Sequence, residues 1–180
     1  REHEGHLCDL IEEQGFVVHR LPAPASGFRA EVDPIHAAWL GASWEGDAEQ
    51  TGAGIKTPDV KPDWLVVDHY ALDRRWEHVL RPSVGRIFVI DDLADRIHDC
   101  DLLLDQNVFA DMKACYTSKV PADCRLLLGP EYALLQSVYA DLHDRLPPWE
   151  GSIRRIFISF GGADSENLTG RVLAVFLSLS

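Results

Sequence analysis

Residues 63–71 read Asp63-Trp64-Leu65-Val66-Val67-Asp68-His69-Tyr70-Ala71 and join an apolar run to three polar side chains. Trp64–Val67 is typical of a strand that is buried in a parallel sheet. Parallel sheets bind ligands at the carboxyl ends of their strands, so we interpret Asp68, His69 and Tyr70 as candidate catalytic residues. Alternatively, Asp68 caps a helix and the next two residues belong to an ordinary loop. The spacing alone does not separate these two interpretations.

Further apolar runs repeat this pattern downstream, and helical stretches separate them. We expect strands at Arg86–Ile90, Leu102–Leu104 and Arg125–Leu128, and a shorter one at Phe16–Val18. Helices are expected over residues 7–14, 44–50, 73–80 and 132–144, the third of them capped by Asp73. The last helix carries an apolar stripe that we assign to the core: Leu134, Leu135, Val138, Tyr139 and Leu142. This alternation predicts an α/β fold with a Rossmann-like, doubly wound parallel sheet.

The carboxyl-terminal part of the sequence is predicted to open a second domain. Residues 145–151 contain two adjacent prolines and form a stiff linker. A strand is expected at Arg155–Phe160, followed by a glycine turn and by a helix that runs to Ser180. One strand and one helix cannot bury a core by themselves. We therefore expect a first Rossmann-like domain over residues 1–146 and the first strand and helix of a second domain over residues 153–180.

Composition and charge exclude several classes of partner. The formal net charge of −12 disfavours a broad electrostatic contact with nucleic acid or with an anionic membrane surface. No apolar stretch is long enough to cross a membrane, and no signal peptide is seen. The 4 cysteines have no metal-binding or disulfide spacing. We expect a cytoplasmic protein with reduced thiols.

Two other segments have a functional and a structural interpretation. The turn Gly161-Gly162-Ala163-Asp164 precedes a helix, so its amides could cradle a phosphate, but a tight turn with Ser165 or Asp164 as helix cap is the more common explanation. Asp91-Asp92, Asp99 and Asp101 surround His98 and suggest a metal site. Carboxylates at strand ends also serve as helix caps and loop anchors. Because no spaced ligand motif is present, we predict that no metal and no cofactor is bound.

Seven ordered motifs together resemble one known family. They are His36-Ala37-Ala38-Trp39-Leu40-Gly41, Trp44-Glu45-Gly46-Asp47-Ala48-Glu49-Gln50-Thr51, Asp68-His69-Tyr70-Ala71-Leu72-Asp73 with Trp76-Glu77, Ile90-Asp91-Asp92-Leu93-Ala94-Asp95-Arg96, Cys100-Asp101 through Leu104-Asp105-Gln106-Asn107, Leu128-Gly129-Pro130-Glu131-Tyr132-Ala133-Leu134-Leu135, and Ser159-Phe160-Gly161-Gly162-Ala163-Asp164 with Asn167-Leu168-Thr169. Through these motifs the chain resembles the UDP-2,4-diacetamido-2,4,6-trideoxy-β-L-altropyranose hydrolases of bacterial pseudaminic acid biosynthesis, a route to cell-surface glycans and flagellin glycosylation.

The resemblance implies a GT-B architecture, in which two Rossmann-like domains face each other across the substrate cleft. It implies a monomeric enzyme that cleaves UDP from a diacetamido sugar by inverting attack of water at the anomeric carbon. Neither a metal nor a cofactor is implied. A diphosphate leaves readily, so an activated water and donors to the departing charge suffice. Tyr70 matches the active-site phenol, with Asp68 and His69 as its support. Gly161, Gly162, Ala163, Asp164 and Asn167 match the turn that meets the diphosphate.

The resemblance also implies parts that this sequence does not match. The family opens with a strand and a G-x-G-H-x-x-R loop whose histidine activates water. Gly5-His6 does not reproduce that loop, because Asp9 stands where the arginine is expected. We therefore expect a truncated chain that lacks its first strand–helix–strand unit and does not hydrolyse the substrate alone. Two alternatives remain open: a GT-B glycosyltransferase and a non-catalytic module that binds sugar nucleotides.

Overall fold

The computed structural model describes residues 3, 5–24, 27–55, 61–108, 110–147, 151–160, 164 and 166–178. The chain divides into two compact units, residues 1–135 and residues 136–180.

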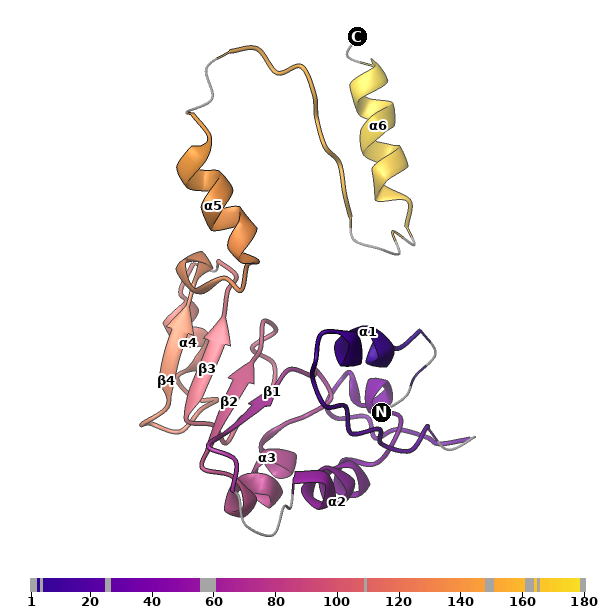
Figure 1. Cartoon of the computed structure of the whole chain (residues 1–180), viewed down its shortest axis with the longest axis vertical. Helices are drawn as coiled ribbons and strands as arrows, with labels where there is room; N and C mark the ends of the chain where they lie inside the picture. The colour runs from indigo at the N-terminus through magenta and orange to yellow at the C-terminus, as the bar shows by residue number, and fades with distance from the viewer. Residues whose placement is uncertain are drawn as a thin grey trace. The chain divides into compact units, whose positions relative to one another are not determined.

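The first unit is built on a parallel sheet of four strands that lie side by side in chain order (Figure 1). The strands are β1 (Trp64–Val67), β2 (Arg86–Ile90), β3 (Leu102–Asp105) and β4 (Arg125–Leu128). The four strands predicted at these positions are confirmed, and β3 continues one residue further than expected, because Asp105 pairs with Leu128. The parallel α/β arrangement is Rossmann-like.

Position in the sheet explains how deeply each strand is buried. β2 and β3 are the central strands, and Ile87 and Leu103 are both 0% exposed. β1 forms an edge of the sheet, so the prediction that it is buried on both faces is wrong. Trp64 is 42% and Val66 is 55% exposed, and only Val67 is buried. An apolar run predicts a strand but does not show whether neighbours cover it.

Helices flank the sheet of the first unit. α-Helices are α1 (Cys8–Glu13), α2 (Trp44–Ile55), α3 (Arg74–Leu80) and α4 (Met112–Tyr116), and short 3₁₀ turns are η1 (Ala37–Leu40), η2 (Arg81–Ser83) and η3 (Pro130–Tyr132). Asp73 caps α3 as predicted, since its carboxylate accepts a hydrogen bond from the Arg75 amide at 2.8 Å. Gly15 follows the end of α1 at a φ of +86°, a left-handed conformation that suits glycine.

α2 extends to Ile55 instead of ending near Gln50 as predicted. Glycines at positions 52 and 54 lower the helix propensity of this segment. Packing against α3 reverses that preference. A Cβ atom at Gly52 would lie 3.2 Å from Cδ2 of Leu80, so the glycine permits the close approach of the two helices. The indole of Trp76 also donates to the Asp47 carboxylate at 3.0 Å and ties α3 to α2.

The second unit contains α5 (Ser137–Arg145) and α6 (Leu168–Ser178). The strand predicted at Arg155–Phe160 is absent, since the described residues 151–160 hold no secondary structure. A strand needs a hydrogen-bonded neighbour, and this segment has none in the sheet of β1–β4. The strand predicted at Phe16–Val18 in the first unit is absent for the same reason.

The helix predicted over residues 132–144 also differs from the structure. Residues 130–132 form η3, and α5 begins only at Ser137. Between them the Leu134 amide donates to the side-chain oxygen of Gln106 at 3.0 Å, which holds this stretch outside a helix. The assignment of its apolar stripe to the core is wrong, because every member is exposed: Leu134 62%, Leu135 68%, Val138 44%, Tyr139 57% and Leu142 42%. Among the described residues, no helix is long and apolar enough to cross a membrane.

Candidate functional site

A cavity of about 140 Å³ lies at the carboxyl ends of β1, β2 and β3. Parallel sheets place ligands at this edge, because the loops that follow the strands converge there. The lining comes from four segments: Asp68 and Tyr70 after β1, Ile90, Asp91 and Asp92 at the end of β2, Leu104 and Gln106 at the end of β3, and Leu134 after η3. Thus two of the three predicted catalytic residues line one cavity.

Tyr70 lies within a cluster of aromatic rings. Its ring centroid is 5.6 Å from that of His36 and 5.7 Å from that of Trp39, and the last two are 4.6 Å apart. His36 and Trp39 belong to the η1 segment, so residues far apart in the sequence meet beside the cavity. On the third side, the guanidinium carbon of Arg96 lies 5.8 Å from the Tyr70 ring centroid, within the range of a cation–π contact.

The hydroxyl of Tyr70 is a hydrogen-bond donor at neutral pH. The Asp92 carboxylate beside it is the largest cause that raises the pKa of Tyr70 to about 12, and burial adds to this. A negative neighbour disfavours the phenolate, so the proton stays on the phenol. Asp92 itself keeps an oxygen, Oδ1, that is buried and has no hydrogen-bond partner among the described residues. Tyr70 and Asp92 therefore lie side by side in the lining of the cavity.

Asp91 anchors the loops beneath the cavity. It is 1% exposed, and its carboxylate accepts hydrogen bonds from the Ala94 amide at 3.0 Å, from the Tyr116 hydroxyl at 3.1 Å and from the Arg96 guanidinium. The single hydroxyl proton of Tyr116 is shared with Asp105, whose carboxylate lies 2.9 Å away, so Tyr116 joins the ends of β2 and β3 to α4. Asp91 is thus a loop anchor, and the next residue, Asp92, lines the cavity.

Arg96 connects three segments around the same cavity. Besides Asp91, its guanidinium donates to the backbone carbonyl of Leu72 at 3.1 Å and to Asp95 at 2.6 Å. The side chain is only 4% exposed, so these bonds act in a region shielded from water. Together with its position over Tyr70, they fix the loop after β1 against the loop after β2.

The acidic cluster that suggested a metal site is a structural network in this fold. His98 Nδ1 lies 2.7 Å from Glu77 Oε1, and both residues are buried. Asp99 and Asp101 both pair with Arg81, at 2.9 Å and 3.1 Å. Within the described ranges, no group of three or more His, Cys, Asp or Glu side chains is arranged to hold a metal ion.

His69 does not line the cavity. Its Nδ1 accepts a hydrogen bond from the Ala71 amide at 3.0 Å, so Nδ1 carries no proton and the neutral ring holds its proton on Nε2. Burial is the main cause that lowers the pKa of His69, which favours this neutral form. With one nitrogen accepting and the other protonated, the imidazole stabilises the turn after β1 and is not poised to remove a proton from water.

Part of the predicted diphosphate turn, Gly161, Gly162 and Ala163, lies outside the described residues. Asp164 accepts hydrogen bonds from the amides of Leu168 at 2.7 Å and Thr169 at 3.0 Å. Asn167 accepts one from the Gly170 amide at 3.2 Å. Bonds with Thr169 lower the pKa of the Asp164 carboxyl. Both side chains therefore cap α6 and already satisfy the amides of its first turn.

Sequence reasoning left His36 without a partner and did not give Arg96 or Tyr116 a role. His36 and Trp39 lie in one of the motifs, but no spacing rule places that segment beside Tyr70. Arg96 lies four residues after Asp92, and an arginine that close to two adjacent acids at a strand end is a signal that could have been used.

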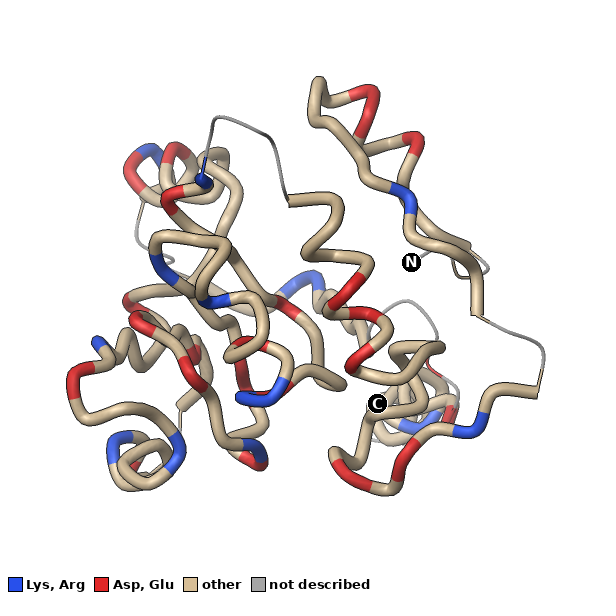
Figure 2. The backbone as a smooth tube through the Cα atoms, turned by 90° about the horizontal axis from the view of Figure 1, so that it is seen from below, with Lys and Arg blue, Asp and Glu red and all other residues tan. Residues whose placement is uncertain are grey.

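Charge is spread through the molecule. Figure 2 shows Asp and Glu along most of the described backbone, with Lys and Arg interspersed, as expected for a net charge of −12. Many cations are paired: Arg75 with Asp73 at 2.9 Å, for example, and Arg20 with Asp9 at 2.9 Å.

No family model matches the chain. A stretch of 110 residues, 61% of this chain, is 29% identical to a curated protein of Campylobacter jejuni named UDP-2,4-diacetamido-2,4,6-trideoxy-β-L-altropyranose hydrolase. The match covers 38% of that protein's length, so this chain corresponds to well under half of it. This similarity supports a distant relationship with a sugar-nucleotide hydrolase.

Proposed function

We propose that this chain is part of an enzyme that cleaves UDP from a 2,4-diacetamido-2,4,6-trideoxy hexose by inverting attack of water at the anomeric carbon. The observation that carries the proposal is the cavity at the strand ends, which the side chains of Tyr70 and Asp92 line together. The distant similarity to a hydrolase named for such a substrate points to the same chemistry.

The side chains around the cavity suit a sugar. Sugar hydroxyl and acetamido groups need both donors and acceptors, which Tyr70 and Asp92 supply. The exposed ring of Trp39 beside Tyr70 offers an apolar face for the C–H groups of a pyranose. At about 140 Å³ the cavity is smaller than the roughly 300–1,000 Å³ of complete ligand pockets, so it would hold the sugar and not the nucleotide.

Each candidate residue has a distinct part in the proposed reaction. Tyr70 donates a hydrogen bond to the sugar or to the attacking water, and Asp68 lines the same cavity. His69 supports the turn that carries both, through its bond to the Ala71 amide. A diphosphate is a good leaving group, so the proposal needs no metal ion and no general acid of high strength.

The remaining parts of the proposal concern architecture. We place a first Rossmann-like domain over residues 1–146 and the beginning of a second over residues 153–180, as in a GT-B enzyme. The turn from Gly161 to Asn167 would meet the diphosphate through its glycine amides. Asp164 and Asn167 would hold the turn in shape, since their side chains cap α6.

The test is release of UDP from the diacetamido-altropyranose nucleotide. Because the match spans 38% of the relative, the assay compares this chain with a version extended by its flanking coding sequence. We expect UDP release and an inverted sugar anomer, seen by proton NMR, from the extended version, unchanged after dialysis against EDTA. Binding of the nucleotide without turnover would favour the non-catalytic module. Transfer of the sugar to an acceptor other than water would favour the glycosyltransferase.

A further inference from the structure

Two of the 4 cysteines lie together at the amino ends of neighbouring strands. Cys100 stands two residues before β3 and Cys124 directly before β4. The Arg125 amide donates to the Asp101 carbonyl at 2.9 Å, which fixes the two strand starts against each other. As a result the two sulfur atoms are 3.6 Å apart, close enough for one thiol to hydrogen-bond the other.

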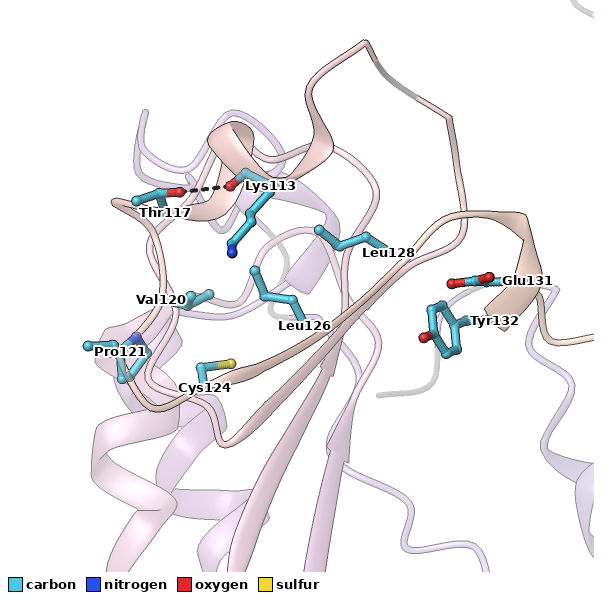
Figure 3. A pocket seen from close by; sticks show the side chains of 10 residues that line it. Lys113, Thr117, Val120, Pro121, Cys124, Leu126, Leu128, Glu131 and Tyr132 are labelled. Carbon is cyan, nitrogen blue, oxygen red and sulfur yellow. Dashed lines mark hydrogen bonds between the residues drawn. The ribbon is translucent and has the colours of Figure 1, made fainter.

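The two thiols differ in access. Cys100 is 1% exposed and belongs to the core. Cys124 is partly exposed and lines a cavity of about 720 Å³ together with Lys113 and Leu126 (Figure 3). A small oxidant in that cavity can therefore reach Cys124 and not the thiol behind it.

The environment separates the reactivity of the two sulfurs. The thiol of Cys100 hydrogen-bonds the sulfur of Cys124, and this bond is the largest cause that lowers the pKa of Cys124 and raises that of Cys100. Burial and the nearby carboxylates of Glu77 and Asp101 raise the pKa of Cys100 further; they act in the same direction on Cys124, where the bond with Cys100 outweighs them. The ammonium of Lys113 lines the same cavity as Cys124. Accessible thiols with a lowered pKa are the ones that oxidants attack.

We propose that Cys124 and Cys100 are an oxidisable dithiol, which a hydroperoxide converts into an intramolecular disulfide. The Cys124 thiolate attacks one peroxide oxygen and breaks the O–O bond, which gives a sulfenic acid and hydroxide. The Cys100 sulfur then attacks the Cys124 sulfur and displaces the hydroxyl group, while the Cys100 proton leaves with it as water. Overall, two thiols and one hydrogen peroxide give one disulfide and two waters. The proposal is independent of the proposed function.

The disulfide would close a loop over residues 100–124. That loop contains α4 with Tyr116, whose hydroxyl bonds Asp91 and Asp105 beneath the strand-end cavity. Because cross-links restrict the unfolded chain, we expect the oxidised protein to melt at a higher temperature than the reduced protein.

The experiment treats the folded chain with hydrogen peroxide, then denatures it, alkylates the free thiols and maps the peptides by mass spectrometry. We expect a peptide pair joined through Cys100 and Cys124, lighter by about 2 Da than the sum of the two reduced peptides. Reduction with dithiothreitol should restore both thiols. Cys115 is an internal control, since its sulfur donates to the Asp111 carbonyl at 3.3 Å and has no thiol partner in the described structure.

A double variant, Cys8→Ser with Cys115→Ser, keeps only the proposed pair and excludes other pairings. In that background Cys124→Ser should abolish the reaction, and Cys100→Ser should leave a sulfenic acid at Cys124 that dimedone traps. The proposal is overturned if the folded double variant keeps both thiols alkylatable after oxidation, or if its disulfides join two chains. Peptide mapping of the unsubstituted chain decides the same question should Cys100→Ser fail to fold.

Discussion

Tyr70 is the residue on which the proposed chemistry depends most directly. It lies just past the carboxyl end of β1, it lines the cavity, and it contacts two aromatic rings and Arg96. Its raised pKa makes it a permanent donor at neutral pH, so it can orient a sugar oxygen or water but cannot act as a base. The raised pKa of Tyr70 can be measured without substrate.

The first prediction is that the Tyr70 phenol loses its proton at a higher pH than an ordinary tyrosine does. The ultraviolet absorbance of the chain minus that of Tyr70→Phe should show one phenol with a midpoint of about pH 12. Because the folded-state pKa lies above the unfolded value of 10.0, the stability contributed by this group is complete below pH 10.0 and is lost as the pH rises toward 12. A midpoint at pH 10 would show that Asp92 lies too far from the phenol to raise its pKa.

The second prediction is kinetic and applies to a version of the enzyme that releases UDP. If the hydroxyl acts chiefly in the transition state, Tyr70→Phe lowers kcat with little change in KM. One such hydrogen bond is worth roughly 1–3 kcal/mol, or about 5- to 150-fold in rate. Tyr139→Phe is the control, since Tyr139 is 57% exposed and lies outside the cavity lining. If Tyr70→Phe keeps both the melting temperature and the kcat of the wild type, Tyr70 is not part of the active site.

Arg96 is predicted to matter more for stability than for binding. Arg96→Gln removes the cation that faces the buried Asp91 carboxylate and leaves that charge without its ion pair. Breaking a buried pair by removing one partner costs about 3–5 kcal/mol. Thermal or urea unfolding of the variant measures this loss, and Arg125→Gln is the exposed control. If both variants unfold alike, the network under the cavity contributes no stability.

At the level of single elements, α3 shows how a local signal is reinforced by tertiary contacts. The carboxylate of Asp73 caps the helix and also pairs with the Arg75 side chain at 2.9 Å. The guanidinium of Arg75 in turn donates to the Asp33 carbonyl at 3.1 Å, so the cap is tied to the loop before η1.

The fourth prediction separates the cap from the ion pair. Asp73→Ala should destabilise the first unit by about 0.5–2 kcal/mol, because it removes the acceptor for the Arg75 amide. Asp73→Asn keeps a capping oxygen but loses the charge, so it should cost less. Chemical denaturation of the three proteins gives the comparison. An equal loss in both variants would assign the effect to the ion pair.

The strands of the first unit could be predicted because each is a short apolar run that ends in polar residues or, for β4, in Gly129-Pro130. Prediction failed where neighbours decide the outcome. Residues 155–160 have the same apolar character as β2 but no partner strand, and Gly52 sits in a helix because α3 packs against it. The site shows the same division. The positions of the strand ends predicted that Tyr70 and the acids after β2 belong to the site. His36 and Trp39, in contrast, reach Tyr70 through a loop that no local sequence rule describes.

On the scale of the whole molecule, the core belongs to residues 1–135. Among the described residues, every buried side chain falls between Pro34 and Tyr116. Neither α5 nor α6 buries a residue in the described structure. The hydrophobic effect that stabilises the fold is therefore concentrated in the first unit.

The last prediction is that the first unit folds without the second. Deleting residues 136–180 removes no buried side chain among those described, so the melting temperature should stay within about 2 °C of that of the whole chain. Leu103→Ala is the matched control, because Leu103 is 0% exposed and its truncation costs about 2–5 kcal/mol. That substitution should lower the melting temperature equally in the whole and the shortened chain. If the deletion alone destabilises as much as Leu103→Ala, the core extends into residues 136–180, and the division into two independently stable parts is wrong.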